Sequence, residues 1–225
     1  MTPALDQTKS LNEPRRLALW EIISVVVSCL IAEWVVMALV SRNKVVMAIP
    51  VLLALGLMVL SHRERGESLR DIGFRIDNFT AALSNLWLPT LGAVVAVVAI
   101  LFVTSTLSDV APWRHRFFAL PLWALFQQYA LNGFINRRAQ VALGSGRRSV
   151  ILVALAFSIV HLPNPMLAIV TFIGGLIWAA AYQRQPNLFA LALSHTVVSI
   201  AFALTVSTSL DSLRVGFKYF GFFWF

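Results

Sequence analysis

The sequence has few charged residues and a single cysteine. Charged side chains make up 12% of the 225 residues, whereas soluble proteins carry about a quarter. Because Cys29 is the single cysteine, an internal disulfide and a cysteine-based metal site are excluded. Its apolar neighbours in the sequence indicate that it is a small packing residue. Hydrophobic residues reach 59% and the mean hydropathy is +0.79. This composition is typical of a polytopic membrane protein.

The chain is basic, with a net charge of +8 and an isoelectric point near 10.8. No nucleic-acid-binding motif accompanies this charge, so we expect the lipid bilayer as a partner and no nucleic acid. Most arginine and lysine residues fall in alternate loops, beginning with the N-terminal segment. The N-terminus is therefore predicted to lie in the cytoplasm.

Long apolar runs predict an all-α bundle of about seven to eight transmembrane helices. A polar N-terminal segment, residues 1–16, precedes a single transmembrane domain, residues 17–225. The first run is too long for a signal peptide, so we expect it to be retained. The expected spans are 17–40, 45–60, 81–107, 117–135, 150–161, 166–182 and 188–207. Gly174-Gly175 in the sixth span is expected to allow close approach of another helix. A loop is expected at 136–149, and the aromatic tail at 213–225 suits an interface or a partial eighth span.

Polar residues interrupt three of these spans. Gln128 and Asn132 lie four residues apart, as do His195 and Ser199, so each pair shares a helix face. A polar group buried without a partner costs several kcal/mol. We therefore expect convergence on one intramembrane cavity, lined by Gln127, Gln128, Asn132, His161, His195 and Ser199.

The residue types leave three uses for such a cavity open. The polar groups can act as hydrogen-bonding glue between helices, worth about 1 kcal/mol each. His161 and His195 can ligate a metal, although catalytic zinc normally has three protein ligands and these spans offer no third. The same imidazoles can polarise a water or an oxyanion for peptide hydrolysis, which also needs a general base. No internal repeat is present, which disfavours a transporter.

Phe157-Ser-Ile-Val-His161 is followed by Gly174-Gly175 and then by Ser194-His195, within a core at 117–207. In this order the motifs resemble those of the CPBP family of intramembrane proteases. That family includes CAAX prenyl endopeptidases and bacterial bacteriocin-processing and Abi-type self-immunity proteins. Its motifs read Glu-Glu-x-x-x-Arg, Phe-x-x-x-His and His-x-x-x-Asn or Asp, each on its own helix. The resemblance implies a hydrolase of the bacterial cytoplasmic membrane that acts on membrane-embedded or prenylated peptides without a cofactor.

The departures from the family pattern fall on its polar residues. Gln127-Gln128 stands in place of the glutamate pair, Asn132 in place of the arginine, and Ser199 ends the last motif. In the family the second glutamate can pair with the arginine, and exchanging both for neutral amides avoids leaving a buried charge unpaired. Gln127 can position a water but cannot accept its proton.

Three outcomes follow for the chemistry. The protein can be a pseudoprotease that binds peptides, in the manner of an immunity-type protein. Alternatively, His161 or His195 acts as the base while the other, with Ser199, holds the oxyanion. In the third outcome Glu33 of the first span supplies a substitute carboxylate, unless it lies at the far interface beside Arg42 or Lys44.

Overall fold

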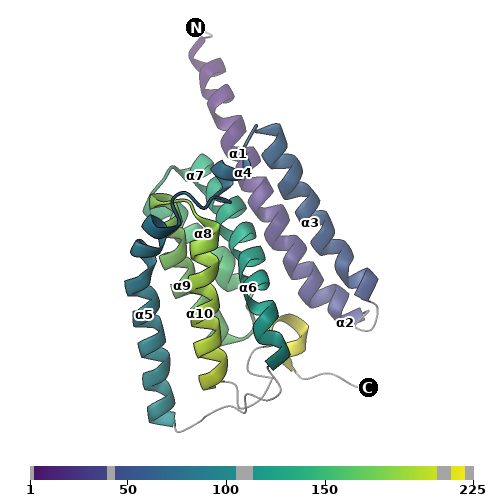
Figure 1. Ribbon diagram of the computed structural model, residues 1–225. Helices are drawn as coiled ribbons and strands as arrows, with labels where there is room; N and C mark the ends of the chain where they lie inside the picture. The colour runs from purple at the N-terminus through teal and green to yellow at the C-terminus, as the bar shows by residue number, and fades with distance from the viewer. Residues whose placement is uncertain (1–2, 40–43, 105–113, 207–213, 221–225) are drawn as a thin grey trace.

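The computed structural model describes residues 3–39, 44–104, 114–206 and 214–220, and the described residues form helices without any β-strand (Figure 1). The all-α class is therefore confirmed. The helices are α1 Pro3–Leu30, η1 Ile31–Val36, α2 Met37–Leu39, α3 Lys44–Glu64, α4 Leu69–Ile72, α5 Phe79–Thr104, α6 Arg114–Gln128, η3 Tyr129–Asn136, α7 Arg137–Leu143, α8 Arg147–Ile159, α9 Pro165–Arg184, α10 Leu188–Val206 and η5 Gly216–Phe220.

Three helices among the described residues are long and apolar enough to cross a bilayer: Glu13–Val36, Phe79–Ala99 and Pro165–Arg184. Leu188–Leu204 is a shorter apolar helix. Large apolar side chains also cover the outer surface, such as Leu52 with 62% of its area exposed. Such a surface suits lipid rather than water. The chain is a membrane protein, and the larger number of seven to eight spans stays a prediction.

The helices form two groups joined by one long central helix. In Figure 1, α1 and α3 make an antiparallel hairpin on one side, whereas α5, α9 and α10 lie on the other. The consecutive elements α6, η3 and α7 run between the groups, with α7 against α1 and α6 against α10. The middle of this long helix is π-helical, and π-helical turns occur frequently at functional sites.

Helices α8 and α9 approach each other closely at a glycine. A Cβ atom added to Gly175 would lie 2.8 Å from the Cα of Ala154, so only glycine fits without movement. The close approach expected for Gly174-Gly175 is thus present at Gly175. It brings Phe157 on α8 within 6.1 Å of Trp178 on α9, measured between ring centroids.

The prediction of a loop at 136–149 is wrong. Arg137–Leu143 is helix α7, and α8 begins at Arg147, so only three residues connect them. Gly144 and Gly146 make this short turn with φ angles of +80° and +121°, which other residues rarely adopt. The arginines made the segment look too polar for a packed helix, but the charge on Arg138 is neutralised inside the protein.

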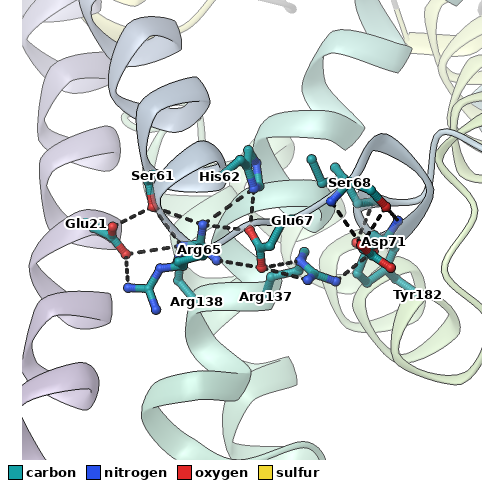
Figure 2. A network of polar contacts seen from close by, with 11 residues as sticks. Glu21, Ser61, His62, Arg65, Glu67, Ser68, Asp71, Arg137, Arg138 and Tyr182 are labelled. Atoms are coloured by element: carbon teal, nitrogen blue, oxygen red, sulfur yellow. Dashed lines mark hydrogen bonds and ion pairs between the residues drawn. The ribbon is translucent and has the colours of Figure 1, made fainter.

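A network of charged side chains ties the α1–α3 hairpin to α7 (Figure 2). Arg138 is completely buried, and it contacts Glu67 at 2.9 Å and Glu21 at 3.1 Å. His62 and Arg137 also bind Glu67. Burial favours a higher pKa for Glu67, but the hydrogen bonds from His62 and the two arginines hold it well below its ordinary value.

Residues 68–73, which follow this network, contact the end of α9 and the start of α10. Ser68 caps α4 with a reciprocal capping box. The Tyr182 hydroxyl donates to the carbonyl of Ile72 at 2.6 Å, and the Leu188 amide donates to that of Gly73 at 2.9 Å. These two hydrogen bonds therefore fix the end of α9 and the start of α10 against the segment that follows the charged network.

Candidate functional site

His161 lies in the turn that follows α8, four residues after the motif residue Phe157. The fifth helix was expected to reach His161, but α8 ends at Ile159 because the turn leads into Pro163. The His161 Nδ1 atom lies 2.6 Å from the carbonyl oxygen of Phe157. A carbonyl only accepts hydrogen bonds, so Nδ1 carries a proton. In the neutral ring, Nε2 is then free to accept a proton.

His195 on α10 is buried against aromatic rings. Its imidazole centroid lies 4.3 Å from the Trp178 ring and 6.0 Å from that of Phe157. The edge of Phe157 also contacts His161, at 4.9 Å between centroids. Both histidines therefore pack on one phenylalanine, although His161 lies in the turn after α8 and His195 lies on α10. The Trp178 indole N–H donates to the Ser194 hydroxyl at 3.0 Å, which fixes the ring beside His195.

Buried amides extend from His195 along the central helix. Gln128 Nε2 lies 3.1 Å from His195 Nδ1, and Asn132 donates to the Gln128 carbonyl oxygen at 2.7 Å. The contact expected between Gln128 and Asn132 is thus present. Asn136 continues the series by donating to Asn132 at 2.9 Å. All three amides are fully buried, so they depend on one another for hydrogen bonds.

Gln127 and Ser199 lie near this group without joining it. Each side chain is half-buried, and within the described residues neither forms a hydrogen bond to His161 or His195. Ser199 lies one turn beyond His195 on α10. Their expected roles in catalysis, and the shared cavity itself, stay predictions.

Glu33 lies in the π-helical stretch η1 and packs on the tail. Its carbonyl oxygen would be 2.7 Å from a Cβ placed on Gly216, whose N–H donates to Leu162 at 2.9 Å. Leu162 follows His161 directly, so Gly216 lies between Glu33 and the histidine in this chain of contacts. One Glu33 carboxylate oxygen is buried without a hydrogen bond. Arg42 and the Lys44 side chain, its alternative partners, lie outside the described residues.

The described residues include no group of three His, Cys, Asp or Glu side chains placed to hold a metal. The tail expected at 213–225 is described only over 214–220, where η5 packs Phe220 on Trp34 at 6.1 Å between ring centroids. Cys29 is half-buried and is a free thiol.

Three residues of this arrangement were not expected from the sequence. Trp178, Asn136 and Gln183 all contact the group or extend it. Asn136 continues the four-residue spacing of Gln128 and Asn132, which was a usable signal. Trp178 had none, because its partners His195 and Ser194 lie on another helix.

The segment that contains the two histidines and the buried amides also matches the model of a known family. Residues 112–201 match the family model described as type II CAAX prenyl endopeptidase Rce1-like. The resemblance drawn from the motifs is thereby confirmed for this segment. It includes both histidines, the amide series and Trp178, while α1, α3 and α5 lie outside it. No curated protein and no solved structure gives a significant match.

Proposed function

We propose that the protein is a CAAX-type intramembrane endopeptidase that hydrolyses peptide bonds of membrane-embedded or prenylated substrates. The observation that carries this proposal is the packing of His161 and His195 on the same Phe157 ring, inside the segment that matches the endopeptidase family. Two imidazoles from different segments of the chain at one place suit a reaction that needs both a proton acceptor and a hydrogen-bond donor.

His161 is the better proton acceptor of the two. Its Nδ1 proton is bound to the Phe157 carbonyl, so Nε2 takes the proton of a water as the water oxygen attacks the peptide carbonyl carbon. The carbon–nitrogen bond then breaks, and the proton passes from His161 to the leaving nitrogen. His195, with Ser199, stabilises the negative oxygen of the intermediate. The products are a new carboxylate and a new amine.

A second function is favoured by the two glutamines. Neither Gln127 nor Gln128 can take a proton from water. The Gln128 amide is also already hydrogen-bonded to His195 and Asn132. A protein with this site and no base would bind peptides without cutting them. The competing proposal is therefore a pseudoprotease that acts as a membrane binding or immunity-type protein.

Cleavage and binding measured together separate the two proposals. Purified protein in nanodiscs is incubated with a prenylated peptide and a membrane-embedded peptide, and both products and bound peptide are quantified. The endopeptidase predicts cleavage by the wild type. Binding without cleavage, with activity gained by Gln127→Glu, supports the pseudoprotease. If neither peptide is cleaved or bound by any of these proteins, both proposals fail.

The proposal also includes the membrane in which the protein lies and its orientation there. We expect the protein in a bacterial cytoplasmic membrane with its N-terminus in the cytoplasm. The charged network of Glu21, Glu67 and Arg138 then lies at the cytoplasmic end of the protein. A reporter protein that is active only in the cytoplasm is expected to be active when it is fused before residue 1.

A further inference from the structure

The buried amides that reach His195 have a single consistent direction. Each side-chain amide offers one accepting oxygen and one donating nitrogen, so its orientation can be deduced from its partners. The deduction begins at two backbone groups, because a backbone N–H only donates and a backbone C=O only accepts. These groups belong to Gly146 and Ala179.

The first fixed amide is that of Gln183 on α9. The backbone N–H of Gly146 donates to Gln183 Oε1 at 2.8 Å, so the other end must be the nitrogen. That nitrogen donates to Asn136 Oδ1 and to the Ser149 hydroxyl, both at 2.9 Å. Asn136 is thereby oriented with its oxygen toward Gln183.

The second backbone group gives the same orientation for Asn136. Asn136 Nδ2 donates to the carbonyl of Ala179 at 3.1 Å and to Asn132 Oδ1 at 2.9 Å, which uses both of its hydrogens. Asn132 must then donate to Gln128 Oε1, at 2.7 Å. Gln128 consequently turns its nitrogen toward His195.

This direction determines where His195 carries its proton. Gln128 Nε2 donates to His195 Nδ1 at 3.1 Å, so Nδ1 must be the accepting nitrogen. Reversing the whole series would place two oxygens together at Ala179 and two donors together at Gly146. The mismatch at Ala179 would be buried, where unmade hydrogen bonds are most costly, whereas the one at Gly146 would lie in an exposed turn.

We propose that the amide series Gln183, Asn136, Asn132 and Gln128 fixes His195 in the neutral tautomer with its proton on Nε2. His195 is then a hydrogen-bond donor at Nε2, whereas His161, with its proton on Nδ1, has a free acceptor at Nε2. The two histidines are set in opposite tautomers. The catalytic meaning of this difference rests on the proposed endopeptidase function, but the tautomers themselves do not.

Nitrogen-15 spectroscopy of the imidazoles tests the proposal without requiring activity. The protein is labelled at all four histidines in lipid nanodiscs, and each signal is assigned from the variant that lacks that histidine. For His195 the expected spectrum shows a protonated Nε2 and an unprotonated Nδ1. A protonated Nδ1 in the wild type would overturn the proposal.

Two variants test the series itself. In Gln128→Glu both carboxylate oxygens accept, so His195 Nδ1 is expected to become protonated while His161 is unchanged. Asn136→Leu removes the anchor at Ala179, so His195 is expected to show both tautomers. The matched control is Gln140→Leu, because Gln140 also contacts Asn136 but lies outside the path to His195.

The outcomes separate this inference from the proposed function. An unchanged His195 signal in both Gln128→Glu and Asn136→Leu would show that the amides do not set the tautomer. The wild-type spectrum and the nearly isosteric Gln128→Glu remain decisive if Asn136→Leu does not fold. If the protein shows the expected tautomers but cleaves no peptide, the endopeptidase proposal fails and the tautomer proposal stands.

Discussion

Trp178 and His195 lie face to face, with ring centroids 4.3 Å apart and planes tilted by 32°. They come from different helices, and Ser194 holds the indole by accepting its N–H at 3.0 Å. The same serine hydroxyl contacts Thr90 on α5 at 2.6 Å. The position of His195 thus depends on α5 and α9 as well as on its own helix.

Replacing Trp178 with phenylalanine is expected to keep the ring contact and lose the hydrogen bond to Ser194. The loss of one buried hydrogen bond costs about 1 kcal/mol, so we expect a modest fall in the thermal midpoint and a few-fold fall in peptide cleavage. Trp123→Phe is the control, since Trp123 is exposed on α6. Equal effects of the two substitutions on cleavage would contradict the positioning of His195 by Trp178.

Replacing Glu67 with glutamine is expected to destabilise the protein by about 3 kcal/mol. Breaking a buried ion pair by removing one partner costs about 3–5 kcal/mol, and the lower value applies because Glu21 still contacts the buried Arg138. Unfolding in detergent with increasing denaturant measures the change. Glu64→Gln, at an exposed position close by in sequence, should change the stability by less than about 0.5 kcal/mol. A similar small change in Glu67→Gln would show that the network is not stabilising.

The stabilisation from Glu67 is also expected to resist mild acid. Its folded pKa is held well below the ordinary value of 4.5 by His62, Arg138 and Arg137. A carboxylate with a depressed folded pKa contributes fully above its unfolded pKa, and the contribution is lost as the pH falls through the folded pKa. The difference in thermal midpoint between wild type and Glu67→Gln should therefore be constant from about pH 8 to pH 5.5 and narrow below about pH 4.5. A difference that disappears near neutrality would contradict the assignment.

Gly175→Ala is expected to push α8 away from α9. The added methyl group would lie 2.8 Å from the Ala154 backbone, and overpacking of this kind costs about 1–3 kcal/mol. Thermal unfolding in nanodiscs is expected to show a clear loss of stability. Gly92→Ala on α5 is the control, because no atom lies within 4 Å of its added methyl group. If Gly175→Ala is as stable as Gly92→Ala, the close approach does not hold the two helices together.

The sequence was a good guide wherever the signal was local. Composition predicted a helical membrane protein, the four-residue spacing predicted the Gln128–Asn132 contact, and the glycine pair predicted the close approach at Gly175. The motif around Phe157 and His161 led to a protease family similar to the one whose model matches residues 112–201. Each inference needed only neighbouring residues or the order of motifs along the chain.

The sequence was a poor guide to contacts between distant segments. Arg138 looked like a loop residue because nothing near it in sequence shows that Glu67 and Glu21 neutralise it. The pairing depends on how the α1–α3 hairpin packs against α7. Trp178 was missed for the same reason, since its contact with His195 exists only once α9 and α10 have come together.

The central claim is that His161 acts as the proton acceptor in peptide hydrolysis. Its most direct test is the initial rate of cleavage of a prenylated peptide in nanodiscs, for wild type and His161→Gln, with products identified by mass spectrometry. We expect the wild type to cleave and His161→Gln to be slower by about 10²–10⁴-fold, the typical contribution of a general base, with an unchanged thermal midpoint confirming that the variant is folded. A folded His161→Gln variant that cleaves at the wild-type rate would contradict the account.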